Sequence, residues 1–375
     1  MSIRTYLGWL STVTSLVCLC GATGCEGDDP EPGGGTPDAG DQDGGGACAV
    51  DDGIVPADGA SCTAAADDYT PRDQGSANDT WQACISDDNT YHRFDESIST
   101  IARIGAFERI ADLLAFDGSR VPTAEDFVEA RLAYVEDQGL ESRISRREDE
   151  HYPAAPSACR DLTADEQAQY PDRCVGPVKI VPMLNEAFQQ GAAGVDPVLQ
   201  AARVEAALLW FLYVSVYKES TTCKDTVADC DSSYAYYSGG EDRSGGLGLS
   251  RYVKARSPQA HDRIWDGILA VRCWRDLDNP TGTASNTAMQ EQALAQLDRA
   301  LLRGVAIIVR QRLDRINCAA AWETARILGP VLDRAATDID ATNAQILREQ
   351  VGKTSMDQLG VDAAQTALDS IFPCP

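Results

Sequence analysis

The 375-residue chain contains little histidine, and this shortage limits the kinds of metal site that it can build. Its three histidines, His92, His151 and His261, lie far apart in the sequence. A site built mainly from imidazole ligands, as zinc and copper prefer, is therefore not expected. His261 stands beside an aspartate in a predicted first helical turn, and the charged run 146–151 ends at His151, so both are expected at the surface.

The sequence also lacks the short motifs that mark several enzyme classes. It has no Gly-x-Ser-x-Gly nucleophile elbow, no phosphate-binding loop and no His-Glu-x-x-His helix. Glycines at 239–240, 245–246 and 248 follow no strand pattern, which argues against a dinucleotide-binding loop. No nucleophile stands beside a candidate base, so an enzyme is the third class considered, after a binding protein and a structural protein.

Basic residues are scarce relative to acidic ones. The chain has 32 lysines and arginines against 58 aspartates and glutamates, which gives a formal net charge of −26. Such a chain repels nucleic acids and anionic lipid head groups and attracts cations. We therefore expect no nucleic-acid partner. Simple solubility of an exposed protein is the alternative interpretation of the charge.

Residues 1–24 have the pattern of a bacterial lipoprotein signal peptide. Arg4 supplies the positive start, residues 7–19 form an apolar stretch too short to span a bilayer, and small residues precede Cys25. We expect a lipid on Cys25 that anchors the protein at the bacterial outer membrane, on the periplasmic side or the cell surface. An ordinary cleaved secretory signal is the alternative. Residues 25–47, rich in glycine, proline and acidic residues, are predicted to be an extended tether.

The 13 cysteines are consistent with an exported protein. Cys18 and Cys20 leave with the signal peptide and Cys25 takes the lipid, so ten remain, an even number that suits disulfides in an oxidising compartment. Residues 48–90 are expected to form a cysteine-containing loop or cap. Short spacing favours three local pairs: Cys48–Cys62, Cys159–Cys174 and Cys223–Cys230.

The remaining residues, 91–375, show helical periodicity. Apolar residues recur at three- and four-residue steps, whereas the alternating β-branched runs typical of strands are missing. Residues 197–219 contain an almost entirely apolar stretch from 204 to 217. Helix-start signals occur at Thr123, at Thr163 with Glu166, at Asp196 before Pro197, and at Ser355 with Gln358. We predict an all-α, disulfide-braced multi-helix bundle around one fully apolar central helix.

The stretch 229–246 combines acidic residues, tyrosines and glycines directly after a cysteine pair. Carboxylate and phenolate oxygens are hard ligands that suit iron(III), manganese or calcium. Glu205 and Glu219 lie fourteen residues apart, about 21 Å along a helix, so they cannot share one ion. A buried Glu205 needs an arginine or a bound cation as its partner. The candidate metal ligands are Asp231, Tyr236, Tyr237 and Glu205, with Arg272 and Glu219 in support.

Part of this region resembles a known family. The residues concerned are Asp231-x-x-Tyr234-Ala-Tyr236-Tyr237-x-Gly239-Gly240 and, after a glycine-bearing loop, Ile268-Leu269-Ala-Val-Arg272-Cys273-Trp274. Together they are similar to a segment of the algal iron-assimilation protein family, the iron-assimilating, high-CO2-inducible periplasmic proteins. The resemblance covers residues 229–275 and implies an extracytoplasmic, largely helical protein that binds iron. It supplies no ligand set, and the lipid anchor and acidic tether depart from that family.

The preferred hypothesis is a lipid-anchored extracytoplasmic protein that binds a hard metal ion, with iron as the first choice, for uptake or sequestration. The alternative is a structural or adhesive surface lipoprotein without a metal site. In that case the same tyrosines pack and form hydrogen bonds while the glycines make turns. Convergence of Glu205, Asp231, Tyr236 and Arg272 in space would favour the first hypothesis.

Overall fold

The computed structural model describes residues 64–75, 80–136, 139–316 and 318–373, which all belong to one compact unit. These residues form α-helices, short 3₁₀- or π-helical turns and connecting loops, and they contain no β-strand. The predicted all-α fold is therefore confirmed. The predictions for residues 1–63, including lipidation of Cys25 and the pair Cys48–Cys62, lie outside the described residues.

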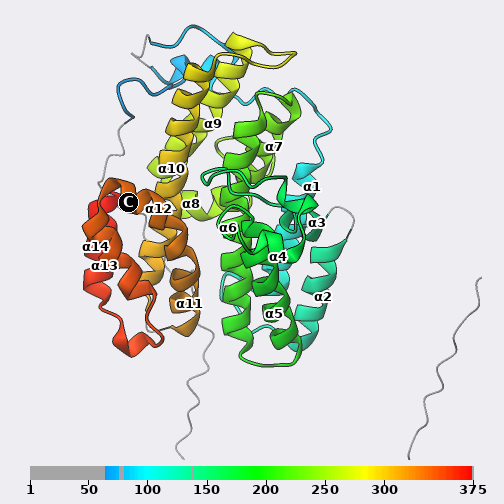
Figure 1. Cartoon of the computed structure of the whole chain (residues 1–375), viewed down its shortest axis with the longest axis vertical. Helices are drawn as coiled ribbons and strands as arrows, with labels where there is room; N and C mark the ends of the chain where they lie inside the picture. The colour runs from blue at the N-terminus through cyan, green and yellow to red at the C-terminus, as the bar shows by residue number, and fades with distance from the viewer. Residues whose placement is uncertain (1–63, 76–79, 137–138, 317, 374–375) are drawn as a thin grey trace, which may run out of the picture. The chain divides into compact units, whose positions relative to one another are not determined.

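Figure 1 shows the helices packed side by side, with α9 and α10 as a long pair and α13 and α14 together near the C-terminus. A π-helical turn, Gly176–Ile180, leads directly into α5, and a 3₁₀ turn, Gly329–Leu332, separates α11 from α12. The α-helices are α1 (Thr100–Leu113), α2 (Ala124–Val135), α3 (Glu141–Ile144), α4 (Ala164–Gln167), α5 (Val181–Ala192), α6 (Pro197–Thr222), α7 (Val227–Ser238), α8 (Leu249–Arg256), α9 (Pro258–Asp278), α10 (Thr287–Asp314), α11 (Ala319–Leu328), α12 (Asp333–Ile339), α13 (Ala341–Val351) and α14 (Val361–Ile371).

Local capping chemistry sets two helix starts as predicted. The backbone N–H of Asp126 donates to Thr123 Oγ1 at 3.2 Å, and α2 begins at the next residue after Thr123. Thr163 and Glu166 form the predicted capping box at α4, in which each side chain bonds the other residue's backbone N–H. These signals act within four residues, so the sequence alone reveals them.

Two other predicted caps are wrong. Helix α6 begins at Pro197 as expected, but Asp196 has a left-handed backbone with φ of +43° and its side chain caps nothing. A capping side chain normally requires an extended backbone at its own residue, which Asp196 does not have. Ser355 precedes only the 3₁₀ turn Met356–Gln358, and α14 begins later, at Val361.

Helix α6 packs against α5, α7, α10 and α11. Within the described residues it is the one helix long and apolar enough to cross a membrane, but 83% of its apolar window is buried by the rest of the fold. Such burial is typical of a core helix. The helix is mainly rather than fully apolar, because Glu205 and Glu219 are buried in it at 2% and 8% exposure.

Three disulfides join pairs of described cysteines. Cys159–Cys174 and Cys223–Cys230 have the predicted partners. The third, Cys84–Cys273, joins residues 189 positions apart, a pairing that spacing does not predict. It ties the segment before residue 90 to α9.

Residues 64–75 and 80–95 run across one end of the α9–α10 pair (Figure 1). The backbone N–H of Tyr69 donates to Gln296 Oε1 at 2.8 Å, and Gln296 Nε2 donates back to the Tyr69 carbonyl at 2.8 Å. Tyr69 and Trp81 are 1% and 3% exposed and pack edge to face. These contacts attach the segment firmly to α10.

Candidate functional site

Asp231, the first predicted metal ligand, anchors a remote segment of the chain. Its carboxylate accepts hydrogen bonds from the backbone N–H groups of Phe94, at 2.9 Å, and Asp95, at 2.7 Å. The Tyr91 hydroxyl donates a further bond at 3.0 Å. Burial raises the pKa of Asp231, and these donors act in the opposite direction. Because protein donors already occupy both carboxylate oxygens, Asp231 does not present an open ligand.

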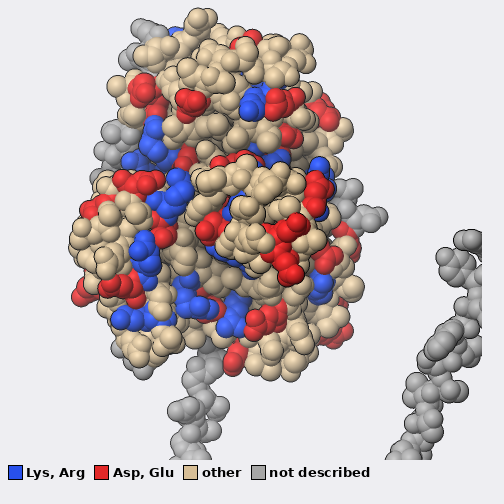
Figure 2. Space-filling view, viewed as in Figure 1, with Lys and Arg blue, Asp and Glu red and all other residues tan. Residues whose placement is uncertain are grey.

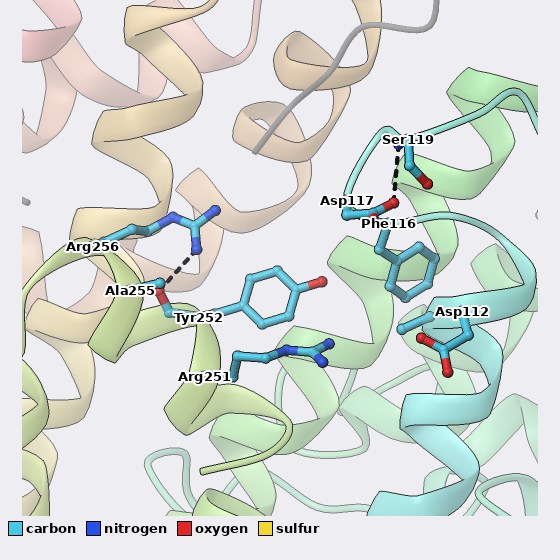
Figure 3. Close-up of a pocket in the computed structure, with 9 residues that line it drawn as sticks. Asp112, Phe116, Asp117, Ser119, Arg251, Tyr252, Ala255 and Arg256 are labelled. Carbon is cyan, nitrogen blue, oxygen red and sulfur yellow. Dashed lines mark hydrogen bonds between the residues drawn. The ribbon is translucent and has the colours of Figure 1, made fainter. Parts of the chain in front are cut away.

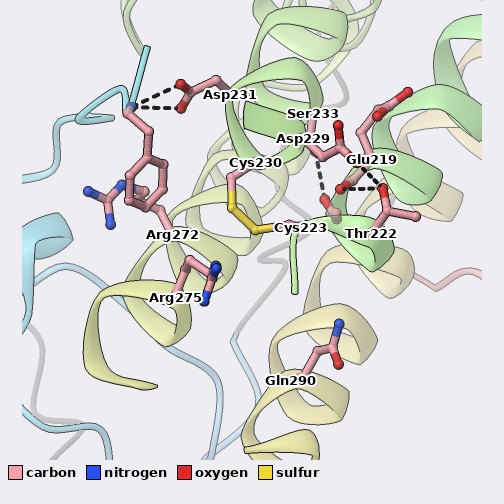
Figure 4. Close-up of a disulfide and its surroundings, with 12 residues drawn as sticks. Glu219, Thr222, Cys223, Asp229, Cys230, Asp231, Ser233, Arg272, Arg275 and Gln290 are labelled. Carbon is pink, nitrogen blue, oxygen red and sulfur yellow. Dashed lines mark hydrogen bonds between the residues drawn. A yellow bond between two sulfur atoms is a disulfide. The ribbon is translucent and has the colours of Figure 1, made fainter. Parts of the chain in front are cut away.

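Arg272 holds the same segment from the other side. Its Nε donates to the His92 carbonyl at 2.7 Å, and its guanidinium lies 3.9 Å from the centre of the Phe94 ring. Figure 4 shows Asp231 and Arg272 on one side of the Cys223–Cys230 disulfide and Glu219 on the other. The pair Asp231 and Arg272 thus fastens residues 91–95 to α7 and α9.

The two predicted tyrosine ligands face different neighbours. His261 Nε2 lies 2.9 Å from the Arg243 carbonyl and therefore carries the hydrogen, so Nδ1 accepts a bond from the Tyr237 hydroxyl at 2.9 Å. Tyr236 instead faces Arg147, whose guanidinium carbon lies 5.3 Å from the centre of the Tyr236 ring. The surface position predicted for His261 is wrong, since Tyr237 of α7 and the loop that carries Arg243 contact its ring and it is 2% exposed.

The two glutamates of α6 are each paired with an arginine. Arg312 Nη2 donates to both carboxylate oxygens of Glu205, at 2.9 and 3.0 Å, so of the two predicted partners, an arginine or a bound cation, the arginine is present. Arg147 Nη1 donates to Glu219 Oε1 at 2.7 Å. Glu205 thus bonds residues of α10 and α11, Arg312 and Thr324, and shares none of the described hydrogen-bond partners of Asp231. In the part of the chain that the structure describes, no group of three or more His, Cys, Asp or Glu side chains is arranged to hold a metal ion.

The charged run 146–151 is a partly buried loop, and the prediction of a solvated helix end is wrong. Helix α3 ends at Ile144, and Arg147 and Asp149 are only 4% and 7% exposed. Burial is possible because remote segments supply partners of opposite charge: Glu219 for Arg147, Arg173 for the two glutamates, and Asp298 for the histidine. These partners are remote in the sequence, so the residues around the run could not predict them.

His151 sits between two carboxylates. Its Nδ1 lies 2.6 Å from Asp149 Oδ1 and its Nε2 lies 2.9 Å from Asp298 Oδ1, so both nitrogens donate and the ring is charged. Burial alone opposes this charge, but the hydrogen bonds to Asp149 and Asp298 outweigh it and raise the pKa of His151 to about 9. The ring stacks on Tyr217 at 3.8 Å between centres. His151 therefore serves as a fixed cation inside the fold.

Residues 146–148 and 150 of the same loop also line a hollow in which most charged groups are basic. It has a volume of about 260 Å³, and we call it the arginine pocket. Its charged lining consists of Arg143, Arg146, Arg147, Arg160 and Lys218, with Glu148, Glu150 and Glu219. Basic groups therefore outnumber acidic ones here, although the chain as a whole carries a net charge of −26.

Each acidic side chain of the arginine pocket has a cationic partner, and for Glu219 the partners are Arg147 and Lys218 of the pocket itself. Arg173 binds Glu148 at 2.9 Å and Glu150 at 2.8 Å, and Glu219 is paired with Arg147. By contrast, the guanidinium groups of Arg143 and Arg146 have no hydrogen-bond acceptor among the described residues, and Nε of Arg146 is buried. The pocket thus presents two cations whose donors are not used.

Like charges are crowded at this point. Burial lowers the pKa of Arg146, and the neighbouring charges of Arg143, Arg103 and Arg147 lower it further. Burial also lowers the pKa of Arg103 on α1, with contributions from Arg143 and Arg147. Guanidinium groups stay protonated despite such shifts, so the repulsion persists at neutral pH. An anion bound among them would relieve it.

Figure 3 shows another hollow, of about 490 Å³, in which Tyr252 lies between Arg251 and Arg256. Both arginines have protein partners: Arg251 is paired with Glu108 at 2.6 Å, and Arg256 bonds Gln311. Since its cations are already used, this hollow is a weaker candidate than the arginine pocket.

Comparisons of the chain with protein-family models, with curated proteins and with solved structures give no match. Function must therefore be inferred from the site itself. One sequence signal points to the arginine pocket: Arg143, Arg146 and Arg147 fall within five positions of a chain that is otherwise strongly acidic.

Proposed function

We propose that the protein is a lipid-anchored, extracytoplasmic binding protein whose ligand is a small anion held in the arginine pocket. The free donors of Arg143 and Arg146 would bind the ligand. Arg160, which is paired with Asp161, and Lys218, which is paired with Glu219, lie at the rim. The anchor at Cys25 and the outer-membrane location rest on the sequence pattern of residues 1–25.

The observation that carries this proposal is unneutralised positive charge in an acidic protein. Figure 2 shows acidic and basic side chains interspersed on the face that it draws, and many described arginines are paired with a carboxylate, such as Arg109 with Glu136 and Arg131 with Glu141. Arg143 and Arg146 depart from that pattern. Crowded cations without partners reduce stability, and binding sites are where such arrangements are kept. Guanidinium groups also match the geometry of phosphate and carboxylate oxygens.

The size of the pocket narrows the class of ligand. A volume of about 260 Å³ is at or below the lower end of the range of about 300 to 1,000 Å³ that drug-sized ligands occupy. Glu148 and Glu150, both held by Arg173, form a fixed wall. An inorganic oxyanion such as phosphate or sulfate, or a small carboxylic acid such as citrate, fits these limits.

Calorimetric titration of the full-length protein in detergent with phosphate, sulfate and citrate tests the proposal. We expect the wild-type protein to bind at least one of them, and the double variant R143Q/R146Q to bind it about 100-fold more weakly. This factor corresponds to the loss of two charge-assisted hydrogen bonds of about 1.5 kcal/mol each.

The matched control is R109Q, because Arg109 is a half-exposed arginine paired with Glu136 on the surface, away from the arginine pocket. It should bind like the wild type. A wild-type protein that binds none of the three anions, or a double variant that binds as tightly as the wild type, would refute the proposal.

Binding of a hard metal ion is a second proposal. It is supported by the resemblance of residues 229–275 to the iron-assimilation family and by the acidic charge. Metal analysis of protein purified without chelator tests it, with D231N and Y236F as comparison variants. Stoichiometric iron in the wild type and less in the variants would support it, whereas background levels in all three would exclude it. If neither an anion nor a metal binds, a structural or adhesive surface lipoprotein is the remaining interpretation.

A further inference from the structure

We propose a second ligand site, separate from the arginine pocket, that takes a neutral polyhydroxylated ligand such as a sugar. The site is a hollow of about 670 Å³ between the loop at 149–152, Trp210 of α6, and helices α12 and α13. We call it the Trp210 cleft. Its volume is within the range of about 300 to 1,000 Å³ found for small-molecule sites.

The charges of the Trp210 cleft are balanced, in contrast to those of the arginine pocket. Four carboxylates line the cleft, and each faces a cation. The pairs are Asp172 with Lys179 at 2.6 Å, Asp333 with Arg348 at 2.6 Å, Asp338 with Arg334 at 3.9 Å, and Asp149 with His151 at 2.6 Å. A wall of paired charges offers no net attraction to an ion, but its oxygens and N–H groups can exchange hydrogen bonds with hydroxyl groups.

Trp210 is more exposed than the other tryptophans that the structure describes, Trp81, Trp265, Trp274 and Trp322, which are all buried. The indole N–H groups of Trp81, Trp265 and Trp274 each donate to a backbone carbonyl. Trp210 is half-buried, and its N–H has no acceptor among the described residues. Lys179 lies over its ring, with Nζ 5.8 Å from the ring centre. An indole face with a cation beside it can stack on the apolar face of a sugar ring while the cation bonds a hydroxyl.

Two further polar groups at the cleft are unused within the part of the chain that the structure describes. Asp149 binds His151 through Oδ1, whereas its Oδ2 accepts no hydrogen bond. The hydroxyl of Tyr152, which also lines the cleft, has no partner either. An acceptor and a donor beside an aromatic face make the combination that a neutral polyol requires.

The test is calorimetric and fluorescence titration of the full-length protein with three neutral disaccharides, maltose, cellobiose and N,N′-diacetylchitobiose. We expect at least one to bind and to change tryptophan emission. W210A should weaken that binding about tenfold or more, because it removes the stacking surface. Y152F removes one hydrogen bond with little change of shape and should weaken binding about 3- to 10-fold.

Two controls make the outcome specific. W322F alters a tryptophan of α11 outside the cleft lining, and R143Q/R146Q alters the arginine pocket. Both should leave disaccharide binding unchanged, so this proposal and that of anion binding can fail separately. Y152F keeps the test decisive if W210A does not fold. The proposal is overturned if no neutral disaccharide binds, if binding is the same in Y152F and the wild type, or if only charged sugars such as digalacturonate or glucosamine bind.

Discussion

Two segments of this protein are equally unusual in sequence but opposite in structure. Residues 229–246 hold the aspartate, tyrosine and glycine cluster, and their polar groups are largely satisfied inside the fold: Asp231 by Phe94 and Asp95, and the Tyr234 hydroxyl by the carbonyls of Gly240 and Glu241. Residues 143–152 also bury charged groups, but they leave Arg143 and Arg146 without acceptors. We call residues 229–246 the closed segment, because protein partners satisfy its polar groups, and residues 143–152 the open segment, because two of its cations have no acceptor among the described residues.

The difference teaches that unusual composition does not by itself mark a binding site. A buried polar group whose hydrogen bonds are complete stabilises the fold, and removing its partner is expensive. A cation without a partner lowers stability and is available to a ligand. The closed segment should therefore respond to mutation through stability, and the open one through binding.

The largest expected effect is on the closed segment. D231A leaves two backbone N–H groups and the Tyr91 hydroxyl without their acceptor, which we expect to lower the free energy of unfolding by roughly 3 to 5 kcal/mol. Urea unfolding measures it. D229A, which removes a single hydrogen bond from Thr222, is the matched control, with an expected loss of about 1 kcal/mol. Equal stability of D231A and the wild type would show that the hydrogen bonds to Asp231 do not stabilise the fold.

A smaller effect is expected from the titration of His151. Because its pKa rises from 6.5 to about 9 on folding, its contribution is complete below pH 6.5 and is lost as the pH rises through 9. This difference corresponds to about 3 kcal/mol of stability. Unfolding curves from pH 6 to pH 10 measure the loss. H151Q should flatten the profile over this range, and an equally steep profile in H151Q would place the titrating group elsewhere.

The smallest effect on stability is expected in the open segment. R143Q/R146Q removes crowded cations that hold no carboxylate, so the free energy of unfolding should stay within about 0.5 kcal/mol of the wild type or rise slightly. Urea unfolding in an anion-poor buffer measures it. A loss of 2 kcal/mol or more would mean that these arginines support the fold, and the contrast between the two segments would break down.

Local features of the fold could be predicted from the sequence, because local chemistry determines them. The cap at Thr123 and the disulfides Cys159–Cys174 and Cys223–Cys230 involve residues close in the chain. The pair Cys84–Cys273 could not be predicted, since its members are 189 positions apart.

The candidate sites were harder to predict for the same reason. His151 is buried because Asp298, 147 positions away, faces it, and a local reading of the run 146–151 cannot reveal that partner. Residue type indicated that a buried Glu205 would need an arginine or a bound cation, and the structure supplies Arg312. It could not show that Asp231 is already satisfied by backbone donors that belong to residues 94 and 95.

The unfolding temperature measured against phosphate, sulfate and citrate concentration tests the anion pocket most directly. For the anion that binds, the wild type should gain stability with the logarithm of ligand concentration above the dissociation constant. R143Q/R146Q should show only the general salt effect, which serves as the baseline at matched ionic strength. Equal gains in the two proteins for all three anions would contradict the assignment of the arginine pocket as a binding site.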